Sequence, residues 1–162
     1  MKTIFYGGEK AGMIVLLALT SLCDIRLVIA QDDIVYDIAK LLGLKVDRVS
    51  NINKQKLVKA DLFVCCHARQ IIGDALIKEY KDRIINLHPC LYLYKGADPV
   101  QRMLKDGITK ASVACHHIIK EVDAGKVIIE NFQEVESKDT VGVYNELYPL
   151  YVKTIIDTIN LI

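Results

Sequence analysis

The chain lacks the excess of one charge and the long apolar run that would each assign it to a particular class of protein. Its formal net charge is +1 over 162 residues, so no basic field favours nucleic acid, and we expect no nucleic-acid partner. The apolar run from Met13 to Leu22 is too short to cross a bilayer, which takes about 20 residues, so we expect no membrane partner.

A cleaved leader is an alternative for the same stretch, since Lys2 precedes the apolar run. The Gly7-Gly8-Glu9-Lys10 interruption and the lack of a small-x-small cleavage pattern argue against it. We therefore expect a cytoplasmic protein.

The chain also lacks the cysteine and histidine spacings of a disulfide framework or a zinc site. Its five cysteines are odd in number and irregularly spaced, and no Cys-x-x-Cys or His-x-x-x-His pair occurs. Buried free cysteines are the ordinary reading, although a site drawn from Cys90, Cys115, His116 and His117 is conceivable. We expect no metal.

What the chain does have is apolar content and a regular alternation of strand and helix patterns. Apolar residues make up 52% of the sequence, enough to require a core, and no repeat or linker divides it, so we expect one domain over residues 1–162. Strands are predicted at 2–6, 25–29, 44–46, 62–66, 84–87, 112–119 and 126–135. Helices are predicted at 13–22, 34–42, 53–58, 72–80, 99–105 and from Thr140, with Asp139 as N-cap and Pro149 bending the last helix.

Alternating strands and helices predict an α/β fold, Rossmann-like and doubly wound, with a mostly parallel sheet and an antiparallel edge from the last two strands. Such sheets bind ligands at the carboxyl ends of their strands. Asn86 and His88 come at one of these ends, and because they stand at i and i+2 they share a face of the strand. Asp123, on a later loop that ends in Gly125, can bring a carboxylate to the same place. An amide, an imidazole and a carboxylate together suit a reaction with a tetrahedral oxyanion and moving protons.

Three stretches of sequence extend this constellation: Ile85-Asn86-Leu87-His88-Pro89-Cys90-Leu91, then Tyr94 to Arg102, then Glu121-Val122-Asp123-Ala124-Gly125. Together they resemble the folate-dependent formyltransferases. That family includes glycinamide ribonucleotide formyltransferase, the catalytic domain of methionyl-tRNA formyltransferase and amino-sugar N-formyltransferases. The resemblance covers residues 62 to 160 well and the first 60 residues more loosely.

The resemblance implies a formyltransferase-like fold and a reaction in which an amine attacks the formyl carbon of 10-formyltetrahydrofolate. It makes Asn86, His88 and Asp123 the catalytic residues: Asn86 donates to the oxyanion, His88 stabilises it or relays a proton, and Asp123 holds His88 and an ordered water. The folate would lie between two segments, whose predicted contacts are Arg69, Gln70, Ile71, Ile72, Ile119, Lys120, Glu121 and Val122.

For the acceptor, the resemblance implies contacts from Gly7, Gly8, Lys10 and His116. The first turn differs from that of the glycinamide ribonucleotide enzymes, because Glu9 would repel a phosphate whereas Lys10 would attract one. The chain ends at Ile162 with no basic excess, which disfavours a tRNA acceptor.

We therefore predict transfer of a formyl group to a primary amine of a small metabolite, either an amino sugar or a glycinamide-like acceptor. A homodimer is a possible assembly. Two alternatives stay open: hydrolysis of 10-formyltetrahydrofolate when water takes the place of the amine, and a folate- or nucleotide-binding module without turnover.

Overall fold

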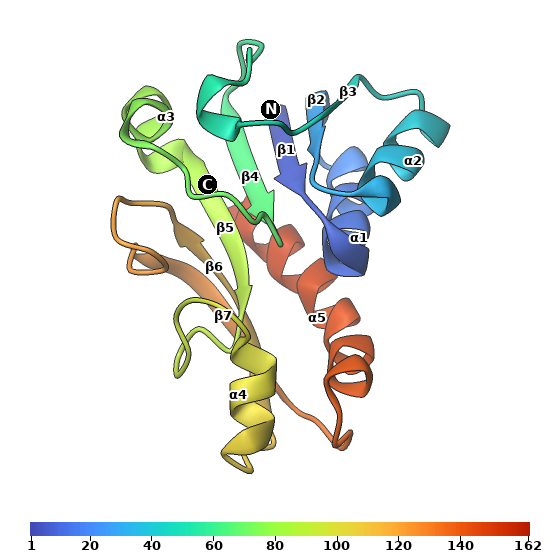
Figure 1. Cartoon of the computed structure of the whole chain (residues 1–162), viewed down its shortest axis with the longest axis vertical. Coiled ribbons are helices and arrows are strands. Elements are labelled where there is room, and N and C mark those ends of the chain that lie inside the picture. Colours follow the sequence, from blue (N-terminus) through green and yellow to red (C-terminus); the bar gives the residue numbers. More distant parts are fainter.

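The computed structural model describes residues 1–162 and consists of one seven-stranded sheet with helices on both faces (Figure 1). The sheet order is β3-β2-β1-β4-β5-β6-β7. The first five of these strands are mutually parallel, whereas β6 and β7 run antiparallel to their neighbours. Their bounds are β1 Lys2–Gly7, β2 Asp24–Ala30, β3 Val46–Arg48, β4 Leu62–Cys66, β5 Ile84–Pro89, β6 Lys110–His117 and β7 Val127–Glu134. The predicted fold class is therefore confirmed.

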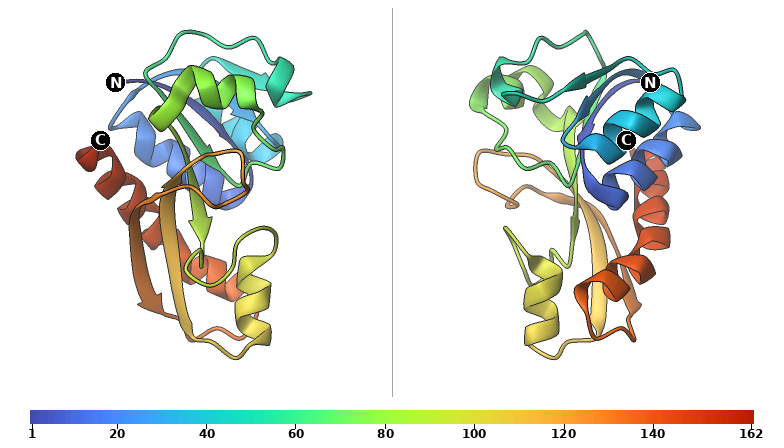
Figure 2. Two further views of the ribbon diagram at one scale, coloured as in Figure 1. Left: turned by 90° about the vertical axis from the view of Figure 1, so that its left-hand side faces the viewer. Right: turned by 45° about the vertical axis from the view of Figure 1, so that its right-hand side comes forward.

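Side-chain alternation along the strands produces two cores, one on each face of the sheet. Phe5 and Val64 point to the larger core, which α1, α2, α4 and α5 cover, whereas Ile4 and Phe63 point to the smaller core beneath α3. The right-hand view of Figure 2 shows α3 on one side of the sheet and α1, α2 and α5 on the other. The helices are α1 Glu9–Thr20, α2 Asp33–Leu41, α3 Asp74–Tyr80, α4 Pro99–Lys105 and α5 Thr140–Leu161. None of them combines the length and apolar character needed to cross a bilayer.

The helix predicted at 53–58 is wrong. Only one 3₁₀ turn forms there, Ile52–Lys54, and Gln55 is already extended. The backbone and side chains of this segment bond to the loop after β4 instead: Ile52 N donates to the Gln70 side chain at 2.8 Å, and Asn53 accepts from Gly73 N at 2.6 Å. These bonds to a distant segment take the place of the hydrogen bonds between successive turns that a helix would need.

The last helix, α5, crosses the larger core over 22 residues. Asp139 caps it as expected, its side chain accepting from Gly142 N at 2.9 Å. The apolar face of α5 packs against the larger core, with Leu147, Tyr151 and Ile155 fully buried. Pro149 lies inside the helix, and α5 changes direction along its length in Figure 1.

Candidate active site

A cavity of about 650 Å³ opens at the carboxyl ends of β4 and β5 and extends to the loop between β6 and β7. At this edge of the sheet, parallel strands end and their connecting loops meet, which is where sheets of this class bind ligands. The cavity has an apolar end, which we define by Ile71, Ile72, Ile118, Ile119 and Val122. It has a polar end, which we define by Glu9, His67, Thr140 and Tyr144.

Asn86 and His88 line the cavity because β5 alternates its faces. Leu87 between them points into the larger core. In the antiparallel ladder Asn86 stands opposite His116 of β6, and the Asn86 Nδ2 and His116 Nε2 atoms are 3.3 Å apart. The strand ends at Pro89, which has no N–H to continue a ladder.

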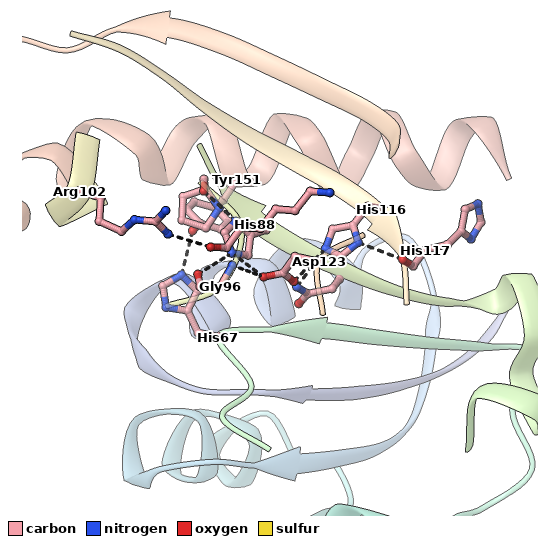
Figure 3. A network of polar contacts seen from close by, with 11 residues as sticks. His67, His88, Gly96, Arg102, His116, His117, Asp123 and Tyr151 are labelled. Carbon is pink, nitrogen blue, oxygen red and sulfur yellow. Dashed lines mark hydrogen bonds and ion pairs between the residues drawn. The ribbon is translucent and has the colours of Figure 1, made fainter. Parts of the chain in front are cut away.

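Asp123 reaches the same place from the loop after β6. Its Oδ2 atom lies 3.0 Å from His88 Nε2 and accepts from Gly96 N at 2.9 Å, and its Oδ1 atom is 3.5 Å from His116 Nε2. Asp123 has a φ of 51°, in the left-handed region that few residues except glycine adopt readily. Gly125 lets the loop pass close to β6, since a Cβ there would lie 1.8 Å from the His117 carbonyl oxygen. Figure 3 shows Asp123 between His88 and His116.

The two histidines of this group have different hydrogen-bond partners. His88 faces only acceptors: Nδ1 lies 2.8 Å from the Pro89 carbonyl, and Nε2 lies near Asp123 and 3.1 Å from the Gly96 carbonyl. The ring can therefore donate a hydrogen bond to the protein from whichever nitrogen carries hydrogen. His116 donates from Nδ1 to the His117 carbonyl at 2.9 Å, so its Nε2 can accept from the Asn86 amide. The second hydrogen of that amide then points to no protein partner.

Burial and charge set the ionisation of this group. Burial lowers the pKa of His116, and neither the His117 carbonyl nor Asp123 offsets this fully, so the ring is neutral near pH 7. For Asp123, burial acts to raise the pKa, but the hydrogen bond and charge of His88 and the Gly96 N–H outweigh it and lower the pKa overall. Asp123 is therefore a carboxylate at neutral pH.

At the polar end, a chain of hydrogen bonds joins the first helix to the last. Glu9 lies 3.0 Å from His67 Nδ1, and His67 Nε2 lies 2.8 Å from the hydroxyl of Tyr151, which is fully buried on α5. Because the Glu9 carboxylate only accepts, His67 Nδ1 carries a hydrogen. Burial raises the pKa of Tyr151, so the phenol keeps its proton and donates it to Nε2. The Arg69 guanidinium also donates to Glu9, at 3.3 Å.

The residues predicted for the folate mostly line this cavity. They are Arg69, Gln70, Ile71, Ile72, Ile119, Lys120 and Val122, whereas Glu121 is not in the lining. The side chain of Gln70 is engaged elsewhere, since it bonds to Ile52 N and to the Ser50 carbonyl.

Only some of the residues predicted to contact the acceptor line the cavity. His116 lines the cavity, and Gly7, Gly8 and Lys10 do not. Sequence reasoning missed His67, Thr140 and Tyr144 as lining residues, and it considered Glu9 only as a repulsive charge. The one sequence signal available for them was position: each follows a strand or lies in the first two turns of a helix at the carboxyl edge of the sheet.

No group of three or more His, Cys, Asp or Glu side chains is arranged to hold a metal ion. Cys90, next to Pro89, is fully buried with its thiol against the Met103 sulfur, and burial raises its pKa. Its thiol belongs to the core.

Comparison with known proteins identifies the family. The model of the formyl transferase family matches residues 22–153, and the chain belongs to this family. Among curated relatives, phosphoribosylglycinamide formyltransferase of Bacillus subtilis is 29% identical over 56% of this chain and 47% of its own length. Methionyl-tRNA formyltransferase of Mesoplasma florum is 27% identical over 90% of this chain and 53% of its own length. The chain thus spans about half or less of the length of the curated relatives it matches first.

Solved structures agree on the fold. Glycinamide ribonucleotide transformylase 1 from Symbiobacterium toebii superposes with a TM-score of 0.84 at 16% identity, covering 98% of this chain and 85% of that one. A formyltetrahydrofolate deformylase from Pseudomonas syringae superposes with a TM-score of 0.81 at 20% identity, covering 97% of this chain and 59% of that one. At this level of identity the likeness establishes the fold.

Proposed function

We propose that the protein transfers the formyl group of 10-formyltetrahydrofolate to a primary amine of a small metabolite. The observation that carries the proposal is the joint position of Asn86, His88 and Asp123 on one cavity wall, with His88 and Asp123 3.0 Å apart. Membership of the formyl transferase family supports the choice of reaction. The apolar end of the cavity fits a flat pterin ring, whose burial its isoleucines would favour.

In the proposed reaction the amine nitrogen bonds to the formyl carbon, and the carbonyl electron pair moves onto oxygen. The free N–H of Asn86 stabilises this oxyanion, and the N–H at His88 Nε2 would turn to it from the Gly96 carbonyl, while Asp123 holds the His88 ring in place. A proton then passes from the former amine nitrogen to N10 of the folate. The bond between carbon and N10 breaks, which leaves an N-formyl product and tetrahydrofolate.

The first test is incubation with 10-formyltetrahydrofolate and a panel of amines, with tetrahydrofolate release followed by absorbance. Asn86→Ala and His88→Ala should each lower kcat by roughly 10²- to 10³-fold, the usual effect of losing one donor to an oxyanion. Asp123→Asn should also lower kcat, because His88 then loses the carboxylate that holds its ring. Asp82→Asn, an exposed carboxylate outside the cavity, is the matched control and should keep full activity.

The same assay separates the alternatives. Formate release without any amine would indicate a hydrolase built on the same residues. Binding of tetrahydrofolate without consumption of the formyl donor would indicate a binding module, and either result would overturn the proposed transfer. The homodimer and the absence of a nucleic-acid partner stay predictions.

A further inference from the structure

The start of α1 has two of its backbone donors already bonded to the protein. Gly8 N donates to the Cys66 carbonyl at 3.2 Å, and Glu9 N donates to Asp32 Oδ2 at 2.5 Å. The other oxygen of Asp32 caps α2 by accepting from Val35 N at 3.1 Å. A helix N-terminus ordinarily attracts anions. Here a carboxylate of the protein itself takes that position.

The two glycines before α1 make this arrangement possible. A Cβ on Gly8 would lie 2.7 Å from Asp32 Oδ2, and a Cβ on Gly7 would lie 2.4 Å from the Cys66 carbonyl oxygen. Neither glycine lines the cavity. The Gly7-Gly8 turn is therefore explained by close packing of the turn after β1 against β4 and Asp32, without a ligand.

Glu9 is the residue of this turn that does face the cavity. Its side chain is 49% exposed, and its backbone has a φ of 60°, which is unfavourable for a residue with a Cβ. His67, its partner across the polar end, also has a positive φ, of 52°. Strained backbone that brings two polar side chains together on a cavity wall is typical of functional sites.

The charge of Glu9 is fixed by its neighbours. The hydrogen bond from His67 and the hydrogen bond and charge of the Arg69 guanidinium outweigh the effect of burial and lower the pKa of Glu9 to about 2. Each carboxylate oxygen has one protein donor, Oε2 from His67 and Oε1 from Arg69. A carboxylate offers about four acceptor positions, so Glu9 can accept further hydrogen bonds from a molecule in the cavity.

We infer that Glu9 selects the acceptor: the part of the acceptor away from its reacting amine donates hydroxyl or ammonium hydrogens to the Glu9 carboxylate and carries no phosphate. This inference rests on the proposed function, because it names the acceptor class of the same site. A phosphate at the polar end would lie near the carboxylates of Glu9 and Asp32. It would find the N–H groups of Gly8 and Glu9 occupied and the charge of Arg69 already paired.

The test compares acceptors that differ only by a phosphate, such as glucosamine and glucosamine 6-phosphate, and a ribosylated glycinamide with and without its 5′-phosphate. In the wild-type protein kcat/KM should favour the unphosphorylated member by about tenfold or more, as expected for a repelled charge at short range. Glu9→Gln, which keeps the shape and removes the charge, should reduce this preference to about threefold or less. Glu79→Gln removes an equal charge from the exposed face of α3 and should leave the preference unchanged.

A binding measurement without turnover accompanies the kinetics. Inorganic phosphate should leave the thermal unfolding of the wild-type protein unchanged and should stabilise Glu9→Gln. If Glu9→Gln does not fold, Glu9→Asn replaces it, because asparagine tolerates a left-handed φ.

The outcomes separate this inference from the proposed function. A wild-type protein that favours the phosphorylated acceptors, or a preference that Glu9→Gln leaves unchanged, would overturn the selection by Glu9. If no amine is formylated, the proposed transfer fails, and the phosphate titration then decides the charge argument by itself. If phosphate stabilises the wild-type protein, the charge argument is wrong. If phosphate stabilises only the Glu9 variant, the charge argument is supported.

Discussion

His116 shows how a single buried side chain orders the proposed oxyanion donor. It is almost completely buried, it is neutral near pH 7, and its Nε2 atom accepts from Asn86. The amide of Asn86 is thereby held with one hydrogen toward β6 and the other free. His116 is therefore a positioning residue in our mechanism: it acts on the reaction through Asn86.

This buried histidine predicts a pH dependence of stability. Because the pKa of His116 is lowered from 6.5 on folding, the unfolded chain binds its proton first as the pH falls. The contribution of the neutral His116 ring to the free energy of unfolding is thus complete above pH 6.5 and is lost progressively below it. The free energy of unfolding, measured with urea between pH 8 and pH 5, should fall more steeply for the wild-type protein than for His116→Gln.

Equal slopes for the wild-type protein and His116→Gln would contradict the assignment of a buried neutral ring.

The loop between β6 and β7 carries Asp123 and depends on Gly125. A Cβ at Gly125 would overlap the His117 backbone, which cannot move without disturbing β6. Gly125→Ala should therefore lower the stability by about 1–3 kcal/mol, as overpacking usually does, and should lower activity further by displacing Asp123. Urea unfolding and the formyl-transfer assay measure the two effects.

Gly43→Ala provides the comparison for that variant. Gly43 has a φ of 68° with no atom near its missing Cβ, so the alanine meets strain of roughly 1 kcal/mol but no overlap. Its activity should stay at the wild-type level. A Gly125→Ala protein that is as active as Gly43→Ala would show that this glycine does not set the position of Asp123.

The helix α5 is bound to the polar end of the cavity by the hydroxyl of Tyr151. Tyr151→Phe keeps the packing of this fully buried ring and removes its hydrogen bond to His67, so it should lower stability by about 1 kcal/mol. It should also weaken acceptor binding, seen as a raised KM, because His67 then loses one of its two supports. Tyr148→Phe, on the same helix and only half-buried, should change neither; a similar effect of both variants would refute a specific role for Tyr151.

At the same scale of elements, most of the fold could be predicted because apolar periodicity and caps are local signals. The helix from Pro99 to Lys105 and the strand from Leu62 to Cys66 match their predicted bounds. The segment 53–58 could not be predicted, since its bonds to Gln70 and Gly73 depend on a distant loop. The polar end of the cavity escaped prediction for the same reason: Glu9, His67 and Tyr151 come together only after β1, β4 and α5 have packed.

For the whole molecule, a cavity that binds folate should couple the ligand to global stability. Saturation with tetrahydrofolate at 100 times its Kd adds about 2.7 kcal/mol, which corresponds to roughly 5–10 °C in Tm for a domain of this size. Differential scanning fluorimetry should show this shift for the wild-type protein. Ile72→Ala, which shortens the apolar end, should reduce it.

Asp123→Asn should keep the shift, because the proposal gives Asp123 a role in the chemistry and not in binding the pterin. The absence of any shift in the wild-type protein up to millimolar tetrahydrofolate would contradict folate binding in this cavity.

The residues with a left-handed backbone conformation around the cavity have a consequence for the evolution of the sequence. Four of the six non-glycine residues with positive φ line it, namely Glu9, His67, Asp98 and Asp123. Glycine at these positions would relieve the backbone, so drift under selection for stability alone would tend to place glycine there. A side chain at such a position costs stability, so we expect the function of the cavity to require it. Homologues that have glycine in place of Glu9 or Asp123 would then be those in which the cavity no longer has this function.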